Sequence, residues 1–137
     1  ALKKSNAFNI SLSNRTYEKS IFLKKKFPEI SIIDWSKLNK MIEKFDIIIN
    51  ATSLGLSSKE DFNFDLNRIS NSSIYIDTIY NPLETNAIKK LKKKNIKTFN
   101  GLNMFVYQGQ KSFYIWTKQN PEIDEGLLSL LENKIKQ

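Results

Sequence analysis

Clusters of small polar residues follow the apolar runs of this sequence, and they are its candidates for chemistry. The run "IIIN" ends at Asn50 and opens into Thr52, Ser53 and Gly55. An apolar run that stops in small polar residues is typical of a buried strand that opens into a loop. Comparable clusters follow the other apolar runs, at Asn14-Arg15-Thr16, Asp77 to Tyr80, and Asn100-Gly101. Their amide, hydroxyl and guanidinium groups suit ligand binding.

Arg15 is the clearest candidate for binding a charged ligand. The chain has 22 basic residues, and only Arg15 and Arg68 are arginines. The planar guanidinium suits phosphate better than the point charge of lysine. In NAD-binding domains an acidic residue after the second strand binds the ribose 2′-hydroxyl, and it would repel a 2′-phosphate. Here Asn14, Arg15 and Thr16 replace it, and Lys19 adds a cation about one helical turn on.

The same residues also allow a plain structural interpretation. Thr16 could be a simple helix N-cap, with Arg15 facing solvent. A capping box would require Glu or Gln three residues after Thr16, and that position is Lys19, so the box is incomplete. From the residues alone, the phosphate clamp and the simple cap explain this segment equally well.

The composition excludes several kinds of catalysis. The chain has no cysteine and no histidine. A disulfide, a thiolate nucleophile, Ser-His-Asp catalysis and imidazole acid–base chemistry are therefore impossible, and we predict no metal site. Any proton transfer must use Lys, Asp, Glu or Tyr.

Charge and hydropathy exclude two classes of partner. The net charge is +8, but the lysines are scattered, with runs at 24–26 and 89–94 that we interpret as solvated helix faces. We therefore expect no nucleic-acid binding. No apolar run approaches the roughly 20 residues of a membrane span, and no signal-like segment is visible, so we expect a cytoplasmic protein without a membrane partner.

Strand-like and helix-like segments alternate along the chain. We expect strands at 8–14, 30–33, 46–50, 73–77 and 96–100, and helices at 16–27, 34–45, 83–95, 103–118 and 124–137. The 46–50 strand should be fully buried, and 51–72 should be loop with at most a turn of helix. This alternation predicts an α/β fold, a Rossmann-like parallel sheet with helices on both faces. Ligands bind such sheets at the carboxyl ends of the strands, so the polar clusters should line one crevice.

One expected feature of a dinucleotide-binding sheet is missing. The glycines, at 55, 101, 109 and 126, form no GxGxxG motif. Residues 1–6 could be the end of the helix that follows such a turn. We therefore expect residues 1–137 to be a partial cofactor-binding domain that lacks its first strand and Gly-rich loop.

Four motifs together resemble the shikimate dehydrogenase family. The segments "NRT", "IINATSLGL", "YIDTIYNPLETN" and "NGLNMFVYQGQKSFYIWT" occur in the order and spacing of that family, from about residue 7 to residue 121. The resemblance implies an NADP-dependent oxidoreductase that interconverts 3-dehydroshikimate and shikimate, in aromatic amino acid biosynthesis. It implies a C-terminal NADP-binding domain. The family's catalytic Lys-Asp pair lies in an N-terminal substrate domain, so no residue here is assigned as catalytic.

The resemblance also implies roles for individual residues. Those that resemble the family's contacts to NADP are Asn14, Arg15, Thr16, Lys19, Thr52, Ser53, Thr78, Gly101 and Met104. The first four correspond to the 2′-phosphate clamp, and Gly101 and Met104 to positions against the nicotinamide. Tyr80 and Gln108 resemble the groups that reach the substrate, a phenol to its carboxylate and an amide to its hydroxyls.

Taken singly, several of these residues have ordinary structural explanations. Tyr80 could be a packed aromatic before Pro82, and Gln108 could hydrogen-bond backbone. Met104, Phe105, Phe113 and Trp116 lie on an aromatic helix and would by default be core residues. Asp77 ends a strand, and we expect it to hydrogen-bond the following turn rather than to transfer a proton.

Two further functions remain open from the sequence. One is a non-catalytic module, either a nucleotide-sensing domain or a basic protein–protein adaptor. The other is a related quinate or amino-shikimate enzyme of the same family, because substrate identity depends on residues outside this chain.

Overall fold

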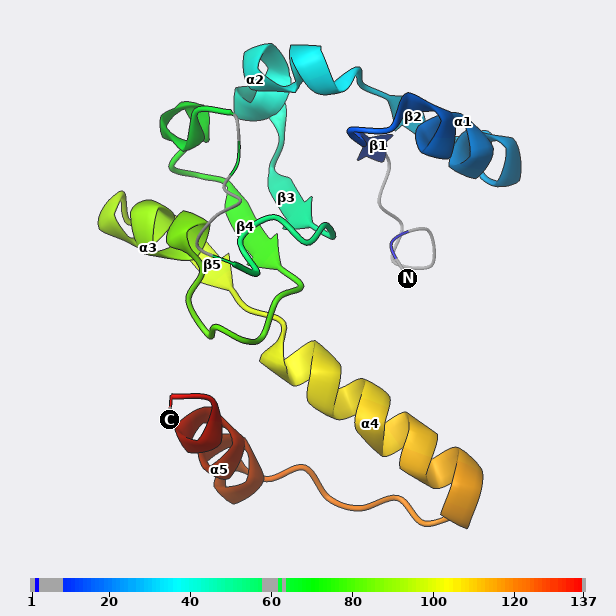
Figure 1. Cartoon of the computed structure of the whole chain (residues 1–137), viewed down its shortest axis with the longest axis vertical. Helices are drawn as coiled ribbons and strands as arrows, with labels where there is room; N and C mark the ends of the chain where they lie inside the picture. The colour runs from blue at the N-terminus through cyan, green and yellow to red at the C-terminus, as the bar shows by residue number, and fades with distance from the viewer. Residues whose placement is uncertain (1, 3–8, 58–61, 63, 137) are drawn as a thin grey trace. The chain divides into compact units, whose positions relative to one another are not determined.

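The computed structural model describes residue 2, residues 9–57, residue 62 and residues 64–136 (Figure 1). Residues 1 and 3–6, part of the expected end of a preceding helix, lie outside the described residues. The chain forms two compact units, Ala1–Glu43 and Lys44–Gln137. Each is described here by itself.

The first unit contains two short parallel strands joined by a helix. Strand β1 (Ser11–Leu12) pairs with β2 (Ser31–Ile32), and α1 (Tyr17–Lys26) forms the crossover and packs against β2. The helix ends before Pro28, as the sequence predicts. Ser20, Ile30 and Ile33 form the buried side of this layer.

The predicted helix at 34–45 is interrupted. It consists of a 3-10 turn, η2 (Trp35–Lys37), one α-helical turn, α2 (Leu38–Met41), and a second 3-10 turn, η3 (Ile42–Lys44). The carboxylate of Asp34 accepts a hydrogen bond from the Ser36 amide at 2.9 Å, and Lys37 N donates to the Asp34 carbonyl at 2.9 Å. These bonds favour the tighter 3-10 geometry at the start of the segment.

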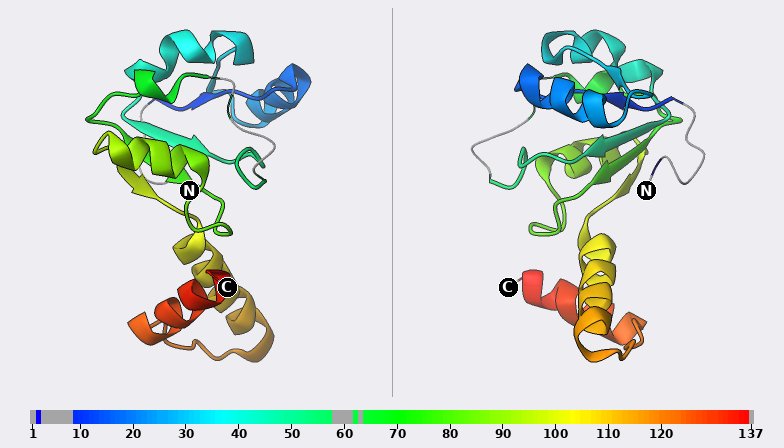
Figure 2. Two further views of the ribbon diagram at one scale, coloured as in Figure 1. Left: turned by 60° about the vertical axis from the view of Figure 1, so that its left-hand side comes forward. Right: turned by 90° about the vertical axis from the view of Figure 1, so that its right-hand side faces the viewer.

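The second unit contains a three-stranded parallel sheet of order β3-β4-β5. Its strands are β3 (Ile47–Asn50), β4 (Ile74–Asp77) and β5 (Lys97–Phe99). The 3-10 turn η4 (Leu66–Arg68) lies in the connection before β4, and α3 (Asn86–Lys93) links β4 to β5 and covers one face of the sheet (Figures 1 and 2). Ala87, Ile88 and Leu91 form the buried stripe of α3.

On the face of this sheet opposite α3, several apolar side chains are exposed. Ile47 is 52% exposed, Ile49 40% and Phe99 47%. Alternate side chains of a strand point to opposite faces, and α3 covers the face that carries Tyr75 and Asp77. Because Ile47 and Ile49 are exposed, the prediction that the 46–50 strand is fully buried is wrong.

Two helices complete the second unit. Helix α4 (Leu102–Thr117) follows Gly101, and α5 (Glu125–Ile135) is capped by Asp124, whose carboxylate accepts from Leu127 N at 2.7 Å. In α4 only Leu102 and Val106 are buried, and no residue of α5 is. Phe105, Phe113 and Trp116 are 37%, 40% and 80% exposed, so the default assignment of these residues to the core is wrong.

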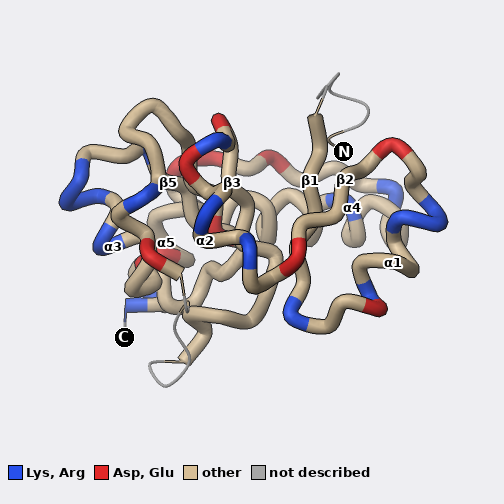
Figure 3. The backbone as a smooth tube through the Cα atoms, turned by 90° about the horizontal axis from the view of Figure 1, so that it is seen from above, with Lys and Arg blue, Asp and Glu red and all other residues tan. Residues whose placement is uncertain are grey.

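The charged residues support the interpretation of the lysine runs. The lysines at 24–26 are exposed in the last turn of α1, and those at 89, 90, 92 and 93 are exposed on α3 (Figure 3). Of the helices that the structure describes, none has the length and hydropathy needed to cross a bilayer.

Candidate functional site

The carboxyl ends of β3, β4 and β5 lie level with one another in the second unit. Asn50 is paired with Asp77, and Ile76 with Phe99. Beyond the strands, Thr78 N donates to the Asn50 carbonyl at 3.0 Å, and Gly101 N donates to the Ile79 carbonyl at 2.9 Å. The turns that carry Thr52, Thr78 and Gly101 are therefore neighbours, as the parallel-sheet rule predicts.

Gly101 has no room for a side chain. An added Cβ would overlap the carbonyl of Thr78. The φ of Gly101 is −82°, which any residue can adopt. Glycine is thus required here by the close approach of two backbone segments, and that approach brings the β4 and β5 turns together.

The turn after β3 is wound around the side chain of Asn50. Its Oδ1 accepts from Thr52 N at 3.1 Å and from the Thr52 hydroxyl at 2.7 Å, and its Nδ2 donates to the Leu54 carbonyl at 3.0 Å. The Thr52 hydroxyl also accepts from Leu54 N at 3.1 Å. The Thr52 side chain therefore shapes the turn, and Ser53 beside it is exposed.

A buried carboxyl group joins this turn to the next one. Asp77 Oδ1 accepts from Asn50 Nδ2 at 3.0 Å and from Ile79 N at 3.1 Å, and Oδ2 accepts from the Thr85 hydroxyl at 2.9 Å. The prediction that Asp77 hydrogen-bonds the following turn is confirmed. Sequence reasoning missed Thr85 entirely, although a threonine just before a helix is a recognisable N-cap signal.

The residues expected near the nicotinamide and the substrate lie at the start of α4 and in the β4 turn. Tyr80 is 37% exposed, and its ring stacks on Phe105 with centroids 4.2 Å apart. Met104 is 56% exposed, and Gln108 is exposed too. No described group hydrogen-bonds the Gln108 amide, so the alternative that it serves only backbone is not supported. Tyr80 is packed, as its structural explanation expects, yet it also reaches solvent.

The proposed phosphate clamp belongs to the first unit. Asn14 Oδ1 accepts from Thr16 N at 2.8 Å, and this bond shapes the turn before α1. Thr16 occupies the N-cap position, but its side chain makes no capping hydrogen bond. Arg15, Thr16 and Lys19 are exposed. Because Thr52 and Gly101 lie in the second unit, convergence of the clamp with them in one crevice stays a prediction.

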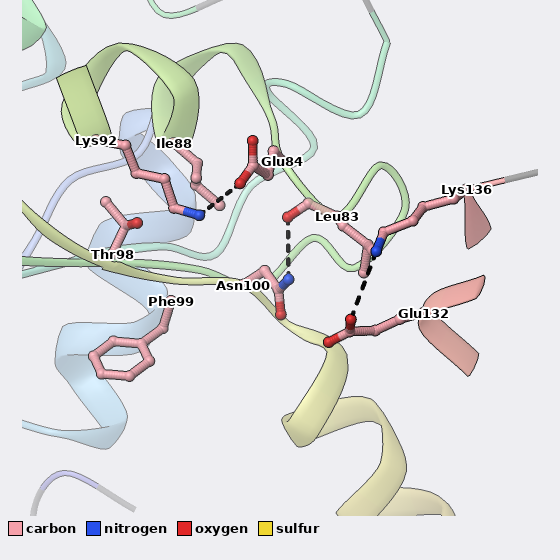
Figure 4. A pocket seen from close by; sticks show the side chains of 9 residues that line it. All are labelled: Leu83, Glu84, Ile88, Lys92, Thr98, Phe99, Asn100, Glu132 and Lys136. Carbon is pink, nitrogen blue, oxygen red and sulfur yellow. Dashed lines mark hydrogen bonds and ion pairs between the residues drawn. The ribbon is translucent and has the colours of Figure 1, made fainter. Parts of the chain in front are cut away.

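The described surface also has a hollow of about 370 Å³ against α3, β5 and α5, which contains none of the predicted site residues. Its charges are paired internally: Lys92 Nζ lies 2.5 Å from Glu84 Oε1, and Lys136 Nζ lies 3.8 Å from Glu132 Oε2 (Figure 4). The hydrogen bond from Lys92 lowers the pKa of the Glu84 carboxyl below its usual value.

A second hollow, of about 540 Å³, lies in the first unit beside Tyr17, Asp34 and Lys37 and contains no predicted site residue either. The hydrogen bond from the Ser36 hydroxyl lowers the pKa of Asp34. Within the described ranges, no group of His, Cys, Asp and Glu could hold a metal ion.

Parallel strands, crossover helices and polar turns at the carboxyl ends define a Rossmann-like α/β protein. Two family models match the chain: "Shikimate / quinate 5-dehydrogenase" over residues 1–103, and "Shikimate 5'-dehydrogenase C-terminal domain" over residues 101–125. The chain belongs to the shikimate / quinate 5-dehydrogenase family.

Individual relatives agree with this assignment. Shikimate dehydrogenase (NADP(+)) of Pelagibacter ubique is 48% identical over 132 residues, which are 96% of this chain and 48% of that protein. The crystal structure of shikimate dehydrogenase from Aquifex aeolicus matches with a TM-score of 0.77 and 32% identity, over 94% of this chain and 45% of that one. A shikimate dehydrogenase in complex with NADP+ matches with a TM-score of 0.73 and 34% identity, over 93% and 46%. The chain thus spans about half the length of the curated relatives it matches.

Proposed function

We propose that this chain is the cofactor-binding part of an NADP-dependent shikimate dehydrogenase. The reaction is hydride transfer between NADPH and 3-dehydroshikimate, in aromatic amino acid biosynthesis and in the cytoplasm. The observation that carries the proposal is the meeting of the Thr52, Thr78 and Gly101 turns at the carboxyl ends of a parallel sheet, in a chain of this family. Such sheet ends are where Rossmann-like folds bind dinucleotides.

The residues at hand fit NADP. The exposed Arg15 and Lys19 supply positive charge for the 2′-phosphate, and α1, a helix of 10 residues, adds its amino-terminal dipole. The Thr16 hydroxyl makes no capping hydrogen bond, so it can donate a hydrogen bond to the 2′-phosphate. No acidic residue lies between Ser13 and Tyr17, and the first carboxylate of α1 is that of Glu18, next to Lys19.

The nicotinamide and substrate sides fit as well. Gly101 lets the β5 turn lie close to the β4 turn, with Met104 exposed one turn into α4. Tyr80 and Gln108 offer a phenol and an amide, which can donate and accept hydrogen bonds without a charge. Such groups suit the carboxylate and hydroxyls of shikimate.

When bound, NADPH supplies the hydride, and the protein supplies position and electrostatics. We assign no catalytic residue to this chain, because the family's Lys-Asp pair belongs to an N-terminal substrate domain. We propose that such a domain is the partner of residues 1–137 in the complete enzyme, and we call the two together the whole protein.

The test is turnover. The purified whole protein is mixed with NADP+ and shikimate, and the absorbance of reduced nicotinamide is followed; the 137-residue chain alone is the parallel sample. We expect reduction by the whole protein and none by the chain alone. Activity of the chain alone would mean that the catalytic residues are misplaced. A whole protein that prefers quinate would point to the paralogous enzyme, and one inactive with both substrates would favour a non-catalytic module.

A further inference from the structure

Three buried polar side chains form a connected cluster between the turns of the second unit. Asn50 is 4% exposed, Asp77 0% and Thr85 1%. Asp77 accepts from Asn50 Nδ2 at 3.0 Å and from the Thr85 hydroxyl at 2.9 Å. Buried polar groups are costly unless they are hydrogen-bonded, and here each is bonded to another of the three. We call Asn50, Asp77 and Thr85 the Asp77 cluster.

Each member of the Asp77 cluster also holds the backbone of one segment. Asn50 bonds Thr52 N and the Leu54 carbonyl, at 3.1 and 3.0 Å. Asp77 accepts from Ile79 N at 3.1 Å. Thr85 caps α3 by accepting from Ile88 N at 3.3 Å. The cluster therefore links the β3 turn, the β4 turn and the amino end of α3, which are separated in sequence.

Two of these segments carry residues that the proposed function uses. The β3 turn carries Thr52 and Ser53, and the β4 turn carries Thr78 and Tyr80. Tyr80 directly follows Ile79, whose backbone N–H donates a hydrogen bond to the Asp77 carboxyl. The Tyr80 ring stacks on Phe105. A change at Asp77 would shift the cofactor-side turn and the substrate-side phenol relative to each other.

We propose that Asp77 and Thr85 are positioning residues for the dehydrogenase reaction. They fix the distance between the cofactor-binding β3 turn and the Tyr80 phenol without touching either ligand, because both side chains are buried and their hydrogen bonds go to one another, to Asn50 and to nearby backbone amides. The assignment of Tyr80 to substrate rests on the proposed function. The linkage of the two turns does not.

A residue that only stabilises the fold would lower the unfolding temperature and leave the kinetics of the folded enzyme unchanged. A positioning residue changes the kinetics of enzyme that is still folded. The chain offers a matched control for this distinction. Ser73, 2% exposed, donates its hydroxyl to the Phe45 carbonyl at 2.7 Å, at the opposite end of β4. Ser73→Ala removes a comparable buried bond far from the turns.

The experiment compares Asp77→Asn, Thr85→Val, Thr85→Ser and Ser73→Ala in the whole protein, well below their unfolding temperatures. Steady-state kinetics with NADP+ and shikimate are combined with amide hydrogen exchange at 51–56 and 78–81. We expect Asp77→Asn and Thr85→Val to lower kcat/KM for shikimate by up to about 100-fold, the size linked to a displacement of about 1 Å. Both should also speed exchange in both turns. Thr85→Ser should restore both properties, and Ser73→Ala should change neither.

A double-mutant cycle sharpens the test. If Asp77 acts through Tyr80, Asp77→Asn should cost much less in a Tyr80→Phe background than in the wild type, because coupled residues are not additive. Additive effects, or kinetics and exchange that match Ser73→Ala, would overturn the positioning role. If the wild-type whole protein fails to oxidise shikimate, the proposed function is wrong. Exchange in the two turns then decides the linkage separately: faster exchange in both turns supports it, and unchanged exchange refutes it.

Discussion

Gly101 and Gly109 stand near the start and the middle of α4, and the structure predicts opposite outcomes for the same substitution. Gly101→Ala places a methyl group onto the Thr78 carbonyl, so we expect the whole protein to lose about 1–3 kcal/mol, the usual cost of overpacking. An added Cβ at Gly109 would meet nothing within 4 Å, and in the 137-residue chain, where no substrate domain covers α4, Gly109→Ala should gain about 0.5–1 kcal/mol from helix propensity. Thermal unfolding of both variants checks the pair, and equal midpoints would contradict the close approach at Gly101.

Arg15 is exposed and lies just before α1, so its replacement should act on the ligand more than on the fold. In the whole protein we expect Arg15→Ala to weaken NADP binding by about 1.5–3 kcal/mol, the value of a charge-assisted hydrogen bond. Binding of NAD, which lacks the 2′-phosphate, should hardly change. Calorimetric titration with both cofactors measures the difference. Lys24→Ala, which removes one positive charge from the exposed side of α1, is the control, and equal losses for NADP and NAD would refute the clamp.

Single residues were predictable where their partners are near in sequence. Asp77 bonds Ile79, two residues on, and its role follows from its place at the end of a strand. Its bond to Asn50 spans 27 residues and depends on strand order, which local patterns do not reveal. Likewise periodicity places the aromatic residues of α4 near one helical face, but it cannot tell whether anything lies against that face.

At the scale of elements, an ion pair joins α3 to the loop that precedes it. Lys92 of α3 reaches back to Glu84, and its hydrogen bond lowers the pKa of the Glu84 carboxyl from the ordinary 4.5. A carboxyl with a lowered pKa in the folded state stabilises the fold above pH 4.5, and that contribution disappears as the pH falls through the lowered value. Both side chains are largely exposed, so the pair is worth about 0.2–1 kcal/mol.

We therefore expect Glu84→Gln to lower the unfolding free energy slightly at pH 7 and to match the wild type once the pH is well below 4.5. Urea unfolding of the whole protein at both pH values, with and without 1 M salt, measures the difference. At 1 M salt the Debye length is about 3 Å, so screening of the Lys92–Glu84 attraction should make the difference in unfolding free energy smaller. Glu122→Gln, in the exposed connection before α5, is the control. A difference that grows as the pH falls would contradict the assignment of this pair.

The order and type of the elements were predictable, and their lengths and environments less so. All five expected strands and the helices α1, α3, α4 and α5 are present, since their apolar runs and end signals, such as Pro28 and Gly101, indicate them in the sequence. The 34–45 segment has helical spacing, yet the Asp34 side chain and backbone hold its start in a 3-10 turn. Exposure of Ile47 and Ile49 could not be foreseen, since an apolar strand has the same sequence whether or not a layer covers it.

At the scale of the whole molecule, the apolar stripe of α4 extends past the elements that bury it. Leu102 and Val106 are buried, and Gly109, Phe113 and Trp116 continue the same helical face at the following turns. Phe113 is 40% exposed and Trp116 80%. A helix with an apolar stripe that is only partly buried is typical of one that packs against a further partner. The partner that we propose is the substrate domain of the same enzyme, because the relatives are about twice as long as this chain.

This partner can be detected through tryptophan fluorescence. The chain contains two tryptophans, Trp35 and Trp116, so Trp35→Phe leaves Trp116 as the single emitter. We expect its emission to be red-shifted and strongly quenched by acrylamide in the 137-residue chain, since the indole is 80% exposed. In the whole protein the emission should shift to the blue and resist quenching, because the substrate domain covers the ring. The reciprocal variant, Trp116→Phe, reports on the half-buried Trp35, whose emission should be alike in both proteins. If Trp116 is equally accessible in the chain and in the whole protein, the α4 stripe is not where the two domains meet, and its aromatic residues must serve a different contact.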